Sequence, residues 1–361
     1  MSVKKIAILP GDGIGVEVTR EARQLLELYR DRANLPLELW DLDLGAERYL
    51  RDGVTLPPEV LEEIRRSCSA VLLGALGDPR VKSNDHAREI LFGIRFGCDL
   101  YSNIRPVRAL SDRLVPLKEK KAADVDFVVF RENTEGLYAD IGGHLRKGEP
   151  GEVAIDQDIN TRYGVERIIV AAFEYAKATK RTRVHMADKS NALRHAHELW
   201  LRVFHEVRTR YPGIEAVHMY VDALCLRIVQ APEEFQVIVT NNLFGDIVTD
   251  LAAVLQGGLG MAASANVHSS DAARVAMFEP VHGSAPPLVG KDVANPFAAF
   301  ATVGMMLAHL GWPTEERRIE SAIRRAIDSG NCTGDVGGRL GTRAAAAWVR
   351  DEVKRLIQAG G

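Results

Sequence analysis

The chain of 361 residues lacks several features that would set it apart from ordinary globular proteins. Its four cysteines have no paired spacing, which excludes a disulfide framework and a cysteine-based zinc site and fits a reducing compartment. Basic residues number 46 against 49 acidic ones, so no general attraction to nucleic acid is expected. No apolar run is long enough to cross a membrane, and no apolar signal core begins the chain. We therefore expect a cytoplasmic protein without nucleic-acid or membrane partners.

What the chain does contain is a repeated alternation of short β-branched runs with amphipathic stretches, the pattern of an α/β protein. The Gly- and Ala-rich passage "LQGGLGMAAS" predicts a crossing between two lobes, and a helical region is expected to begin near Pro296. The polar stretch "GGHLRKGEPGEV" is either a projecting hairpin arm or a surface loop. Six runs are predicted as strands: "KIAILP", "AVLLGAL", "DFVVFREN", "TRVHMAD", "AVHMYVDA" and "FQVIVTNN".

The stretch "LPGDGIGVEV" places Gly11, Gly13 and Gly15 directly after the first predicted strand. A glycine-rich turn before a helix can bring backbone N–H groups to a phosphate. The Rossmann fingerprint, however, needs a further glycine where this chain has Val16, and no Walker lysine follows. The pattern alone leaves two interpretations, a turn at a sheet edge or a contact with a cofactor.

A pair of carboxylates is predicted on one helix. In "NNLFGDIVTDLAAVL" the apolar spacing favours a helix that begins after Asn241 and Asn242, which places Asp246 and Asp250 on the same face. Such a pair belongs either to a solvated surface or to a site for a divalent cation, and Mg²⁺ and Mn²⁺ prefer oxygen ligands. Asp222 follows another predicted strand and favours the metal site.

Three arginines point to a carboxylate-bearing ligand. Arg95 lies in "LFGIRFG", while Arg105 and Arg131 are each expected just after a strand. Guanidinium groups bind carboxylates bidentately, although each arginine alone could form a surface ion pair. Tyr138 and Lys189 also follow strands, where they could serve as an acid and a base, or simply be a buried tyrosine and a solvated lysine. Together with the three aspartates, the set suggests a metal-chelated substrate with more than one carboxylate.

Eight segments, in order and spacing, resemble the β-decarboxylating dehydrogenases, a family that includes isopropylmalate, isocitrate, homoisocitrate and tartrate dehydrogenases. They are "LPGDGIG", "DLYSNIRPV", "FRENTEGLY", "DKSNAL", "NNLFGDIVTDLAA", "GGLG", "FEPVHGSAP" and "ANP". The resemblance runs from end to end and implies a two-lobed α/β fold with a large mixed sheet, not a Rossmann fold. Residues 1–104 and 257–361 would form the cofactor-binding lobe, and residues 105–256 the dimerisation and substrate/metal lobe.

The resemblance also implies a homodimer with shared active sites, which uses NAD and Mg²⁺ or Mn²⁺ to oxidise and decarboxylate a small 2-hydroxy dicarboxylic acid. Asp246 and Asp250 would hold the metal with Asp222 of the partner subunit. Tyr138 would be the catalytic acid, and Lys189 of the partner subunit the base. Substrate contacts are expected from Leu91, Phe92, Arg95, Arg105, Arg131 and Asp222, and cofactor contacts from Ile14, His282, Gly283, Ser284, Ala285, Pro286, Asn295 and Asp335.

Leu91 and Phe92, just before Arg95, would give the substrate pocket an apolar wall. Burying an isopropyl group is worth roughly 2 kcal/mol, so (2R,3S)-3-isopropylmalate, an intermediate of leucine biosynthesis, is the expected substrate. The alternative is that both side chains pack into the core. The segment "RENTEG" is closer in sequence to isocitrate, homoisocitrate and tartrate enzymes than to isopropylmalate enzymes. Isocitrate, homoisocitrate, tartrate and D-malate are therefore alternative substrates.

Two further positions depart from the family pattern. Pro287 stands where NAD-dependent relatives usually have an aspartate that binds the adenosine ribose, and Arg88 where many isopropylmalate enzymes have an acid near the nicotinamide. NAD is still favoured over NADP, because nothing in this segment supplies a positive charge for a 2′-phosphate. The alternative outside the enzymes is a non-catalytic regulatory subunit. Such a subunit would be expected to lose catalytic residues, which this chain retains.

Overall fold

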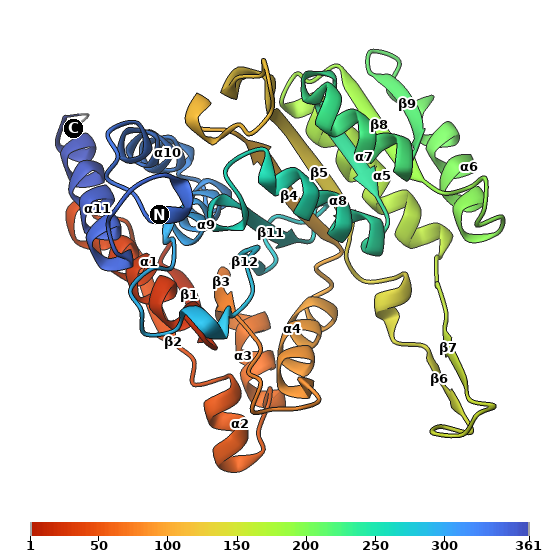
Figure 1. Cartoon of the computed structure of the whole chain (residues 1–361), viewed down its shortest axis with the longest axis horizontal. Coiled ribbons are helices and arrows are strands. Elements are labelled where there is room, and N and C mark those ends of the chain that lie inside the picture. The colour runs from red at the N-terminus through yellow and green to blue at the C-terminus, as the bar shows by residue number, and fades with distance from the viewer. Residues whose placement is uncertain (1, 360–361) are drawn as a thin grey trace. The chain divides into compact units, whose positions relative to one another are not determined.

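The computed structural model describes residues 2–359, which divide into two compact units (Figure 1). Each unit has its own sheet region and its own hydrophobic core. Unit 1 comprises Met1–Leu100, Pro106–Val125 and Ala253–Gly361, and unit 2 comprises Tyr101–Arg105 and Asp126–Ala252.

The segment Pro106–Val125 was assigned from the sequence to the second lobe, and it clusters with unit 1. Hydrogen bonds within unit 1 account for this placement. The N–H of Ala109 donates to the carbonyl of Val125 at 3.1 Å, and the Ser111 hydroxyl donates to the Asp328 carboxylate at 2.6 Å. The chain therefore leaves unit 1, contributes a few residues of strand β4 (Ser102–Arg108) to unit 2, and returns.

The sheet of unit 1 is mixed, as the family resemblance implies. Its strands lie in the order β2-β1-β3-β12-β11. β1 pairs in parallel with β2 and β3, and β12 pairs in parallel with β3, whereas β11 runs antiparallel to β12. The bounds are β1 (Lys4–Gly11), β2 (Leu37–Asp41), β3 (Ala70–Ala75), β11 (Ala263–Val267) and β12 (Ala276–Pro280).

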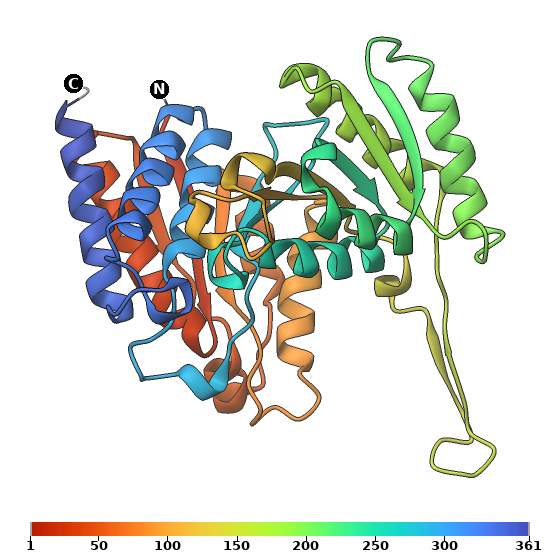
Figure 2. The same cartoon turned by 45° about the horizontal axis from the view of Figure 1, so that its top comes forward.

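Helices cover both faces of this sheet, because its strands are apolar on both sides. Ala7, Leu9 and Val71 belong to a core cluster with side chains of α3 and α4, while the alternate residues Ile6 and Ile8 are buried on the opposite side. There α1 packs beside α9 and α11, the red and blue helices of Figure 2. The helices are α1 (Ile14–Arg32), α2 (Ala46–Asp52), α3 (Pro58–Ser67), α4 (Asp85–Gly97), α9 (Phe297–His309), α10 (Pro313–Asp328) and α11 (Thr342–Ala359).

Helix α9 begins just after Pro296, which confirms the predicted start of the helical C-terminal region. Phe297, Phe300 and Val303 are among its fully buried residues, as expected for a helix that is apolar around most of its circumference. Its contacts with β11, β12 and α10 explain the apolar run in the sequence as protein core. Between residues 2 and 359, no helix has the length and apolar character needed to span a bilayer.

Unit 2 has four parallel strands in the order β5-β10-β8-β9. Helices α5 and α6 share one core cluster with β5, β8 and β10, and α7 packs against β8 and β9 (Figure 1). The elements are β5 (Asp126–Glu132), α5 (Arg162–Ala178), β8 (Arg183–Asp188), α6 (Ala196–Arg208), β9 (Glu215–Tyr220), α7 (Val221–Gln230), β10 (Val237–Thr240) and α8 (Asn242–Val254). All six strands predicted from the sequence are therefore present.

The polar stretch after residue 141 forms a hairpin, which confirms the arm over the surface-loop alternative. β6 (Gly142–Leu145) pairs antiparallel with β7 (Val153–Asp156), and the hairpin projects from unit 2 in both views (Figures 1 and 2). Ile141, Leu145 and Ile155 are about half exposed or more, at 48%, 63% and 53%. An isolated two-stranded hairpin with exposed apolar side chains is marginally stable in water, so we expect another protein surface to pack against this arm.

Arg105 and Arg131 were expected just after strands, and this was wrong by a few residues. Arg105 lies inside β4, and Arg131 is the penultimate residue of β5. Both side chains are almost fully buried, which a strand-end position would not predict. The polar residues were taken as the end of each strand, but buried partners allow the strands to continue through them.

The unit 2 core contains a histidine that should make stability depend on pH. Burial lowers the pKa of His185 in β8 to about 4, and its ring packs on that of Phe235 with the two ring centroids 4.7 Å apart. Because the unfolded histidine titrates near pH 6.5, only the unfolded chain takes up this proton between pH 6.5 and 4. We expect the free energy of unfolding to fall by up to about 2 kcal/mol between pH 7.5 and 5 through this residue.

Urea denaturation of the wild type and of His185→Leu at both pH values measures this effect. The variant should lose about 2 kcal/mol of the pH dependence that the wild type shows. Equal pH dependence in wild type and His185→Leu would contradict the prediction.

Candidate functional site

Helix α8 carries the predicted carboxylate pair on the face expected from the sequence. The Asn241 side chain accepts a hydrogen bond from the Phe244 N–H at 2.8 Å and so caps the first turn. Asp246 and Asp250 follow four residues apart, with side chains 37% and 58% exposed. The helix therefore holds two neighbouring carboxylates within reach of solvent.

Arg131 reaches from β5 along the surface of α8. Its Nε and Nη2 atoms donate to Asn242 Oδ1 at 3.0 and 2.8 Å, and Nη1 pairs with Asp246 Oδ1. A Cβ atom at Gly245 would lie 2.5 Å from Arg131 Cγ. A glycine is thus required where the arginine crosses the helix.

Arg105 approaches the same helix from β4. Its Nη1 donates to Thr249 Oγ1 at 2.7 Å, and its Nη2 lies 3.5 Å from Asp246 Oδ1. Nη1 is also 3.9 Å from Asp250 Oδ1. Two nearly buried guanidinium groups therefore converge on one aspartate, and their positive charges face the more exposed carboxylate beside it.

Tyr138 completes this group. Its hydroxyl donates to Asp246 Oδ2 at 3.1 Å, and the Arg131 guanidinium lies over its ring at 5.4 Å from the centroid. Burial, and then the negative charge of Asp246, raises the pKa of the Tyr138 phenol. Burial and Asp246 likewise raise the pKa of Asp250. The phenol keeps its proton at neutral pH, and the two carboxylates repel each other in a place suited to a cation.

Lys189 and Asp222 form a second group in unit 2. Lys189 directly follows β8, Asp222 lies in the first turn of α7, and Lys189 Nζ pairs with Asp222 Oδ1. This hydrogen bond is the largest cause that lowers the pKa of Asp222. Within residues 2–359, no three His, Cys, Asp or Glu side chains gather closely enough to hold a metal ion. Asp222 therefore does not complete a ligand set with Asp246 and Asp250 inside one chain.

In unit 1 the glycine loop meets a second loop rather than forming a dinucleotide turn by itself. The N–H of Ile14 donates to the Ser284 carbonyl at 2.9 Å. Gly13 has a φ of +58°, and a Cβ atom there would lie 2.1 Å from the Ser284 carbonyl oxygen. The glycine is needed for this close approach between the loop after β1 and the segment from His282 to Pro286.

The remaining predicted cofactor residues also lie in unit 1. Asn295 Nδ2 donates to Asp335 Oδ2 at 2.9 Å, which brings these two residues together. The His282 Nε2 atom is shielded from solvent and has no hydrogen-bond partner in the described part of the chain. Burial lowers the pKa of His282, so its ring is neutral near pH 7. Gly283 is exposed, while Ala285 has a left-handed φ of +40°.

Helix α4 places the predicted substrate side chains in two different surroundings. Leu91 packs against the core cluster of unit 1, as the core alternative predicts. Phe92 is partly exposed and stacks on Phe96 at 5.5 Å. Arg95 is 5% exposed and donates from Nη2 to Glu279 Oε1 at 2.7 Å. Of the two apolar residues, Phe92 is thus the better candidate for a pocket wall.

The glutamate of "RENTEG", Glu135, has a local structural role. The Glu135 carboxylate accepts hydrogen bonds from the N–H and the hydroxyl of Thr161, at 2.8 and 2.5 Å, at the start of α5. A Cβ atom at Gly164 would lie 2.3 Å from Glu135 Cδ, so the helix leaves space for this side chain. Glu135 therefore stabilises the beginning of α5 and gives no direct information about the substrate.

We expect Glu135→Ala to lower the free energy of unfolding by about 1–2 kcal/mol, because two hydrogen bonds at a helix start are lost. The ranking of acid substrates should stay unchanged. Thermal denaturation and relative rates measure the two effects, with the exposed Glu198→Ala as the control. A changed ranking of substrates would instead make "RENTEG" a specificity element.

Sequence reasoning missed several direct partners of the predicted residues. Asn242 and Thr249 bind the two arginines, and Glu279 binds Arg95. Asn242 was noted only as a helix start. Thr249 and Glu279 gave no local signal, because each partner lies more than 140 residues away in the chain.

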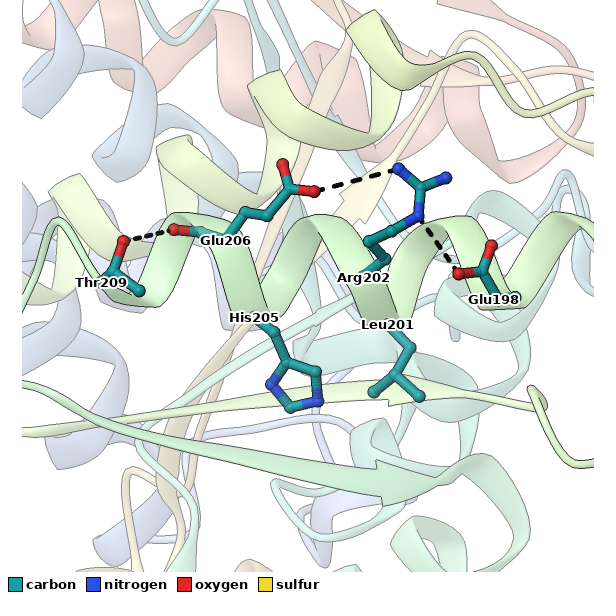
Figure 3. Close-up of a pocket in the computed structure, with 6 residues that line it drawn as sticks. All are labelled: Glu198, Leu201, Arg202, His205, Glu206 and Thr209. Carbon is teal, nitrogen blue, oxygen red and sulfur yellow. Dashed lines mark hydrogen bonds and ion pairs between the residues drawn. The ribbon is translucent and has the colours of Figure 1, made fainter.

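A separate hollow on α6 contains none of the predicted residues. Figure 3 shows Leu201 and His205 on one side of the helix, directed toward neighbouring strands, while Arg202 lies on the other side between two glutamates. Arg202 Nε is 3.1 Å from Glu198 Oε1, and its Nη1 is 3.9 Å from Glu206 Oε1. These are ordinary ion pairs at helical i,i+4 spacing, and they give the hollow no chemistry of its own.

The two units define an α/β protein in which arginines, a tyrosine and aspartates are arranged for an anionic ligand. The chain belongs to the isocitrate/isopropylmalate dehydrogenase family, whose profile matches residues 5–353. It is 42% identical to a 3-isopropylmalate dehydrogenase of Streptomyces griseus, over 94% of this chain and 98% of that one. A Thermobifida fusca protein of the same name is 43% identical with the same coverage. The crystal structure of isocitrate dehydrogenase from Methylococcus capsulatus aligns with a TM-score of 0.87 at 35% identity, covering 98% and 100%.

Proposed function

We propose that the chain is a 3-isopropylmalate dehydrogenase, which converts (2R,3S)-3-isopropylmalate to 4-methyl-2-oxopentanoate and CO₂ with reduction of NAD. The observation that carries this proposal is the convergence of Arg105, Arg131 and Tyr138 on Asp246 of α8. Two buried guanidinium groups and a neutral phenol beside carboxylates suit a dicarboxylic acid. The matched relatives of Streptomyces griseus and Thermobifida fusca carry the same name.

A divalent cation fits the donor set of α8. Asp246 and Asp250 offer only oxygen atoms, and the pKa of Asp250 is raised partly by its acidic neighbour, a repulsion that a cation would relieve. We assign Mg²⁺ or Mn²⁺ to these two residues together with Asp222 of the partner subunit. When bound, the cation would polarise the hydroxyl and adjacent carboxylate of the substrate.

The protein groups then have separate tasks. Arg105 and Arg131 would bind the carboxylate that is not at the metal, a role that the family resemblance implies for Arg95 as well. Lys189 of the partner subunit would take the hydroxyl proton as the hydride leaves. Tyr138, whose raised pKa keeps its proton in place, would protonate the carbon from which CO₂ departs.

The loops of unit 1 fit a dinucleotide. The contact between Ile14 and Ser284 holds two backbone segments together. Because His282 Nδ1 donates to the Gly283 carbonyl at 3.0 Å, its Nε2 atom, which has no partner within residues 2–359, can accept a hydrogen bond from a ligand. We assign the cofactor to Ile14, to the segment from His282 to Pro286, and to Asn295 with Asp335. NAD would accept the hydride; it remains favoured over NADP, although Pro287 provides no side-chain acceptor for the ribose.

A homodimer is supported by exposed apolar side chains of unit 2 on the helices that carry the metal ligands. Leu226 and Val229 on α7 and Ile247 on α8 are between 40% and 57% exposed. A second copy of the chain would cover these side chains and would bring its own Asp222, from the start of α7, to the carboxylates of α8. The exposed apolar residues of the β6–β7 arm support the same partner.

The decisive experiment is to measure initial rates of NAD and NADP reduction, with Mn²⁺ present, for 3-isopropylmalate, isocitrate, homoisocitrate, D-malate and tartrate. We expect kcat/KM for 3-isopropylmalate with NAD to exceed the others by about 100-fold, close to 2.7 kcal/mol. The alternatives are D-malate or tartrate and homoisocitrate or isocitrate, and the matched Methylococcus capsulatus structure is an isocitrate dehydrogenase. A preference for any of the other acids would overturn the substrate assignment. No turnover at all would favour a regulatory subunit.

A further inference from the structure

A buried pair outside the residues assigned above joins the glycine loop to helix α4. Asp12, between Gly11 and Gly13, is 4% exposed, and His86 in the first turn of α4 is 0% exposed. His86 Nε2 lies 2.8 Å from Asp12 Oδ2. The glycines of this loop form a recognisable sequence pattern, whereas the aspartate between them has no role that the pattern predicts.

The same carboxylate accepts two backbone hydrogen bonds. The N–H of Ala46, at the start of α2, donates to Asp12 Oδ1 at 2.6 Å, and the N–H of Gly77, just past β3, donates to Oδ2 at 2.7 Å. Asp12 therefore fixes three separate segments of unit 1 to the loop after β1. Because a carboxylate with these donors acts as an acceptor, His86 Nε2 must carry the hydrogen of their shared bond.

The orientation of His86 depends strongly on this bond. Its other nitrogen, Nδ1, is buried without a hydrogen-bond partner among residues 2–359. The ring stacks on Tyr49 at 5.8 Å with an interplanar angle of 25°, which limits tilting but permits sliding in the plane. The hydrogen bond to Asp12 is thus the directional contact that sets where the first turn of α4 lies.

The contacts continue from α4 back to the cofactor loops. Arg95, two and a half turns further along α4, binds Glu279 of β12, and β12 leads into the segment that starts at His282. Ser284 of that segment binds the N–H of Ile14, two residues after Asp12. Loop, helix, strand and loop therefore form a closed ring of contacts within unit 1.

We propose that Asp12 and His86 are positioning residues that hold α4 in register with the two cofactor loops. This inference rests on the function proposed above and on the substrate contacts expected from Phe92 and Arg95 of α4. Burying a carboxylate costs desolvation energy, and an apolar pair could pack the helix equally well, so the pair is best explained by the single geometry it imposes. Neither residue touches a reacting atom.

The test compares substitutions of His86 in the full-length protein, at a temperature well below each variant's unfolding midpoint. His86→Leu should lower kcat/KM for 3-isopropylmalate at least tenfold and reduce its preference over D-malate, which lacks the isopropyl group. His86→Gln places an amide nitrogen near the position of Nε2 and should restore both values. His86→Asn is too short to reach Asp12 and should resemble the leucine variant.

The matched control is Tyr29→Phe, which removes another buried hydrogen bond of unit 1, from the Tyr29 hydroxyl to the Glu315 carbonyl at 3.3 Å. It should lower the unfolding midpoint and leave the substrate preference unchanged, because it touches neither α4 nor the loops. A similar loss of preference in this control would reduce the role of His86 to general stability and overturn the inference.

The two proposals fail in distinguishable ways. A wild-type protein that turns over none of the acids would overturn the proposed function, and the inference with it. An active wild type together with a His86→Leu variant of unchanged preference would overturn the positioning role alone. If the leucine variant does not fold, the glutamine and asparagine variants decide, since equal preference in these two would overturn it.

Discussion

Replacing Lys189 with methionine is expected to lower kcat about 1,000-fold with little change in KM, the loss typical of a removed general base. Methionine keeps the length of the side chain and removes its charge. The lysine side chain is 28% exposed and pairs with the exposed Asp222, so the fold should be preserved. Steady-state rates on 3-isopropylmalate measure the effect, and the unfolding midpoint verifies the fold.

The matched control is Lys177→Met, which removes an exposed lysine at the end of α5 and should leave kcat unchanged. If Lys189→Met retains a kcat within a few-fold of the wild type, the lysine is not the base and the proposed mechanism is wrong.

Shared active sites can be tested with the same variant. Lys189→Met chains keep Tyr138, and Tyr138→Phe chains keep Lys189. If each site takes its lysine from the partner subunit, a mixed dimer has one intact site. Refolding an equal mixture of the two inactive variants should then recover about a quarter of the wild-type rate. No recovery would mean that both residues serve the same site from one chain.

Local sequence pattern was sufficient for the six predicted strands and for the residues whose spacing defines a face, but it left the hairpin arm and a surface loop as open alternatives. The six strand runs and the helix carrying Asp246 and Asp250 each follow from a few neighbouring residues. Their correct prediction required no knowledge of the distant chain. The same holds for Asn241, whose type and position suit a helix cap.

The contacts that orient these residues could not be predicted in this way. Arg131 is held by Asn242, 111 positions further on, and Arg105 by Thr249, 144 positions further on. Such pairs depend on which strands and helices become neighbours, and a single sequence does not encode that locally. The segment Pro106–Val125 was assigned to the other lobe for the same reason, because its partner Asp328 lies far along the chain.

Glu135 illustrates the opposite case, in which a local pattern was given too much meaning. Isopropylmalate enzymes often have a glycine where this chain has Glu135, and this difference favoured other substrates. The Glu135 side chain, however, binds Thr161 and fits the space above Gly164. Residues that differ between related enzymes can thus reflect packing within one unit. A pattern indicates specificity only when its side chain is also directed toward the ligand.

The second large effect is expected on metal binding, and Asp250 is the best residue at which to test it. Asp246 is bound by Arg105, Arg131 and Tyr138, so its substitution would disturb three other groups at once. Among the residues that the structure describes, Asp250 has one ion-pair contact, to Arg105 at 3.9 Å, and its side chain is 58% exposed. Asp250→Asn therefore removes one carboxylate charge and leaves the arginines and the tyrosine in place.

We expect Asp250→Asn to weaken Mn²⁺ binding in the presence of substrate at least about 100-fold, above the range usual for residues that only support a ligand. Titration of Mn²⁺ by its paramagnetic resonance signal measures binding without any need for turnover. A chelator should abolish wild-type activity, and added Mn²⁺ should restore it. The control is Asp351→Asn, which changes an exposed acid on α11 and should bind Mn²⁺ as tightly as the wild type does. Unchanged Mn²⁺ affinity in Asp250→Asn would show that α8 does not hold the metal. A carboxylate ligand cannot lose its charge without weakening the binding of a divalent cation.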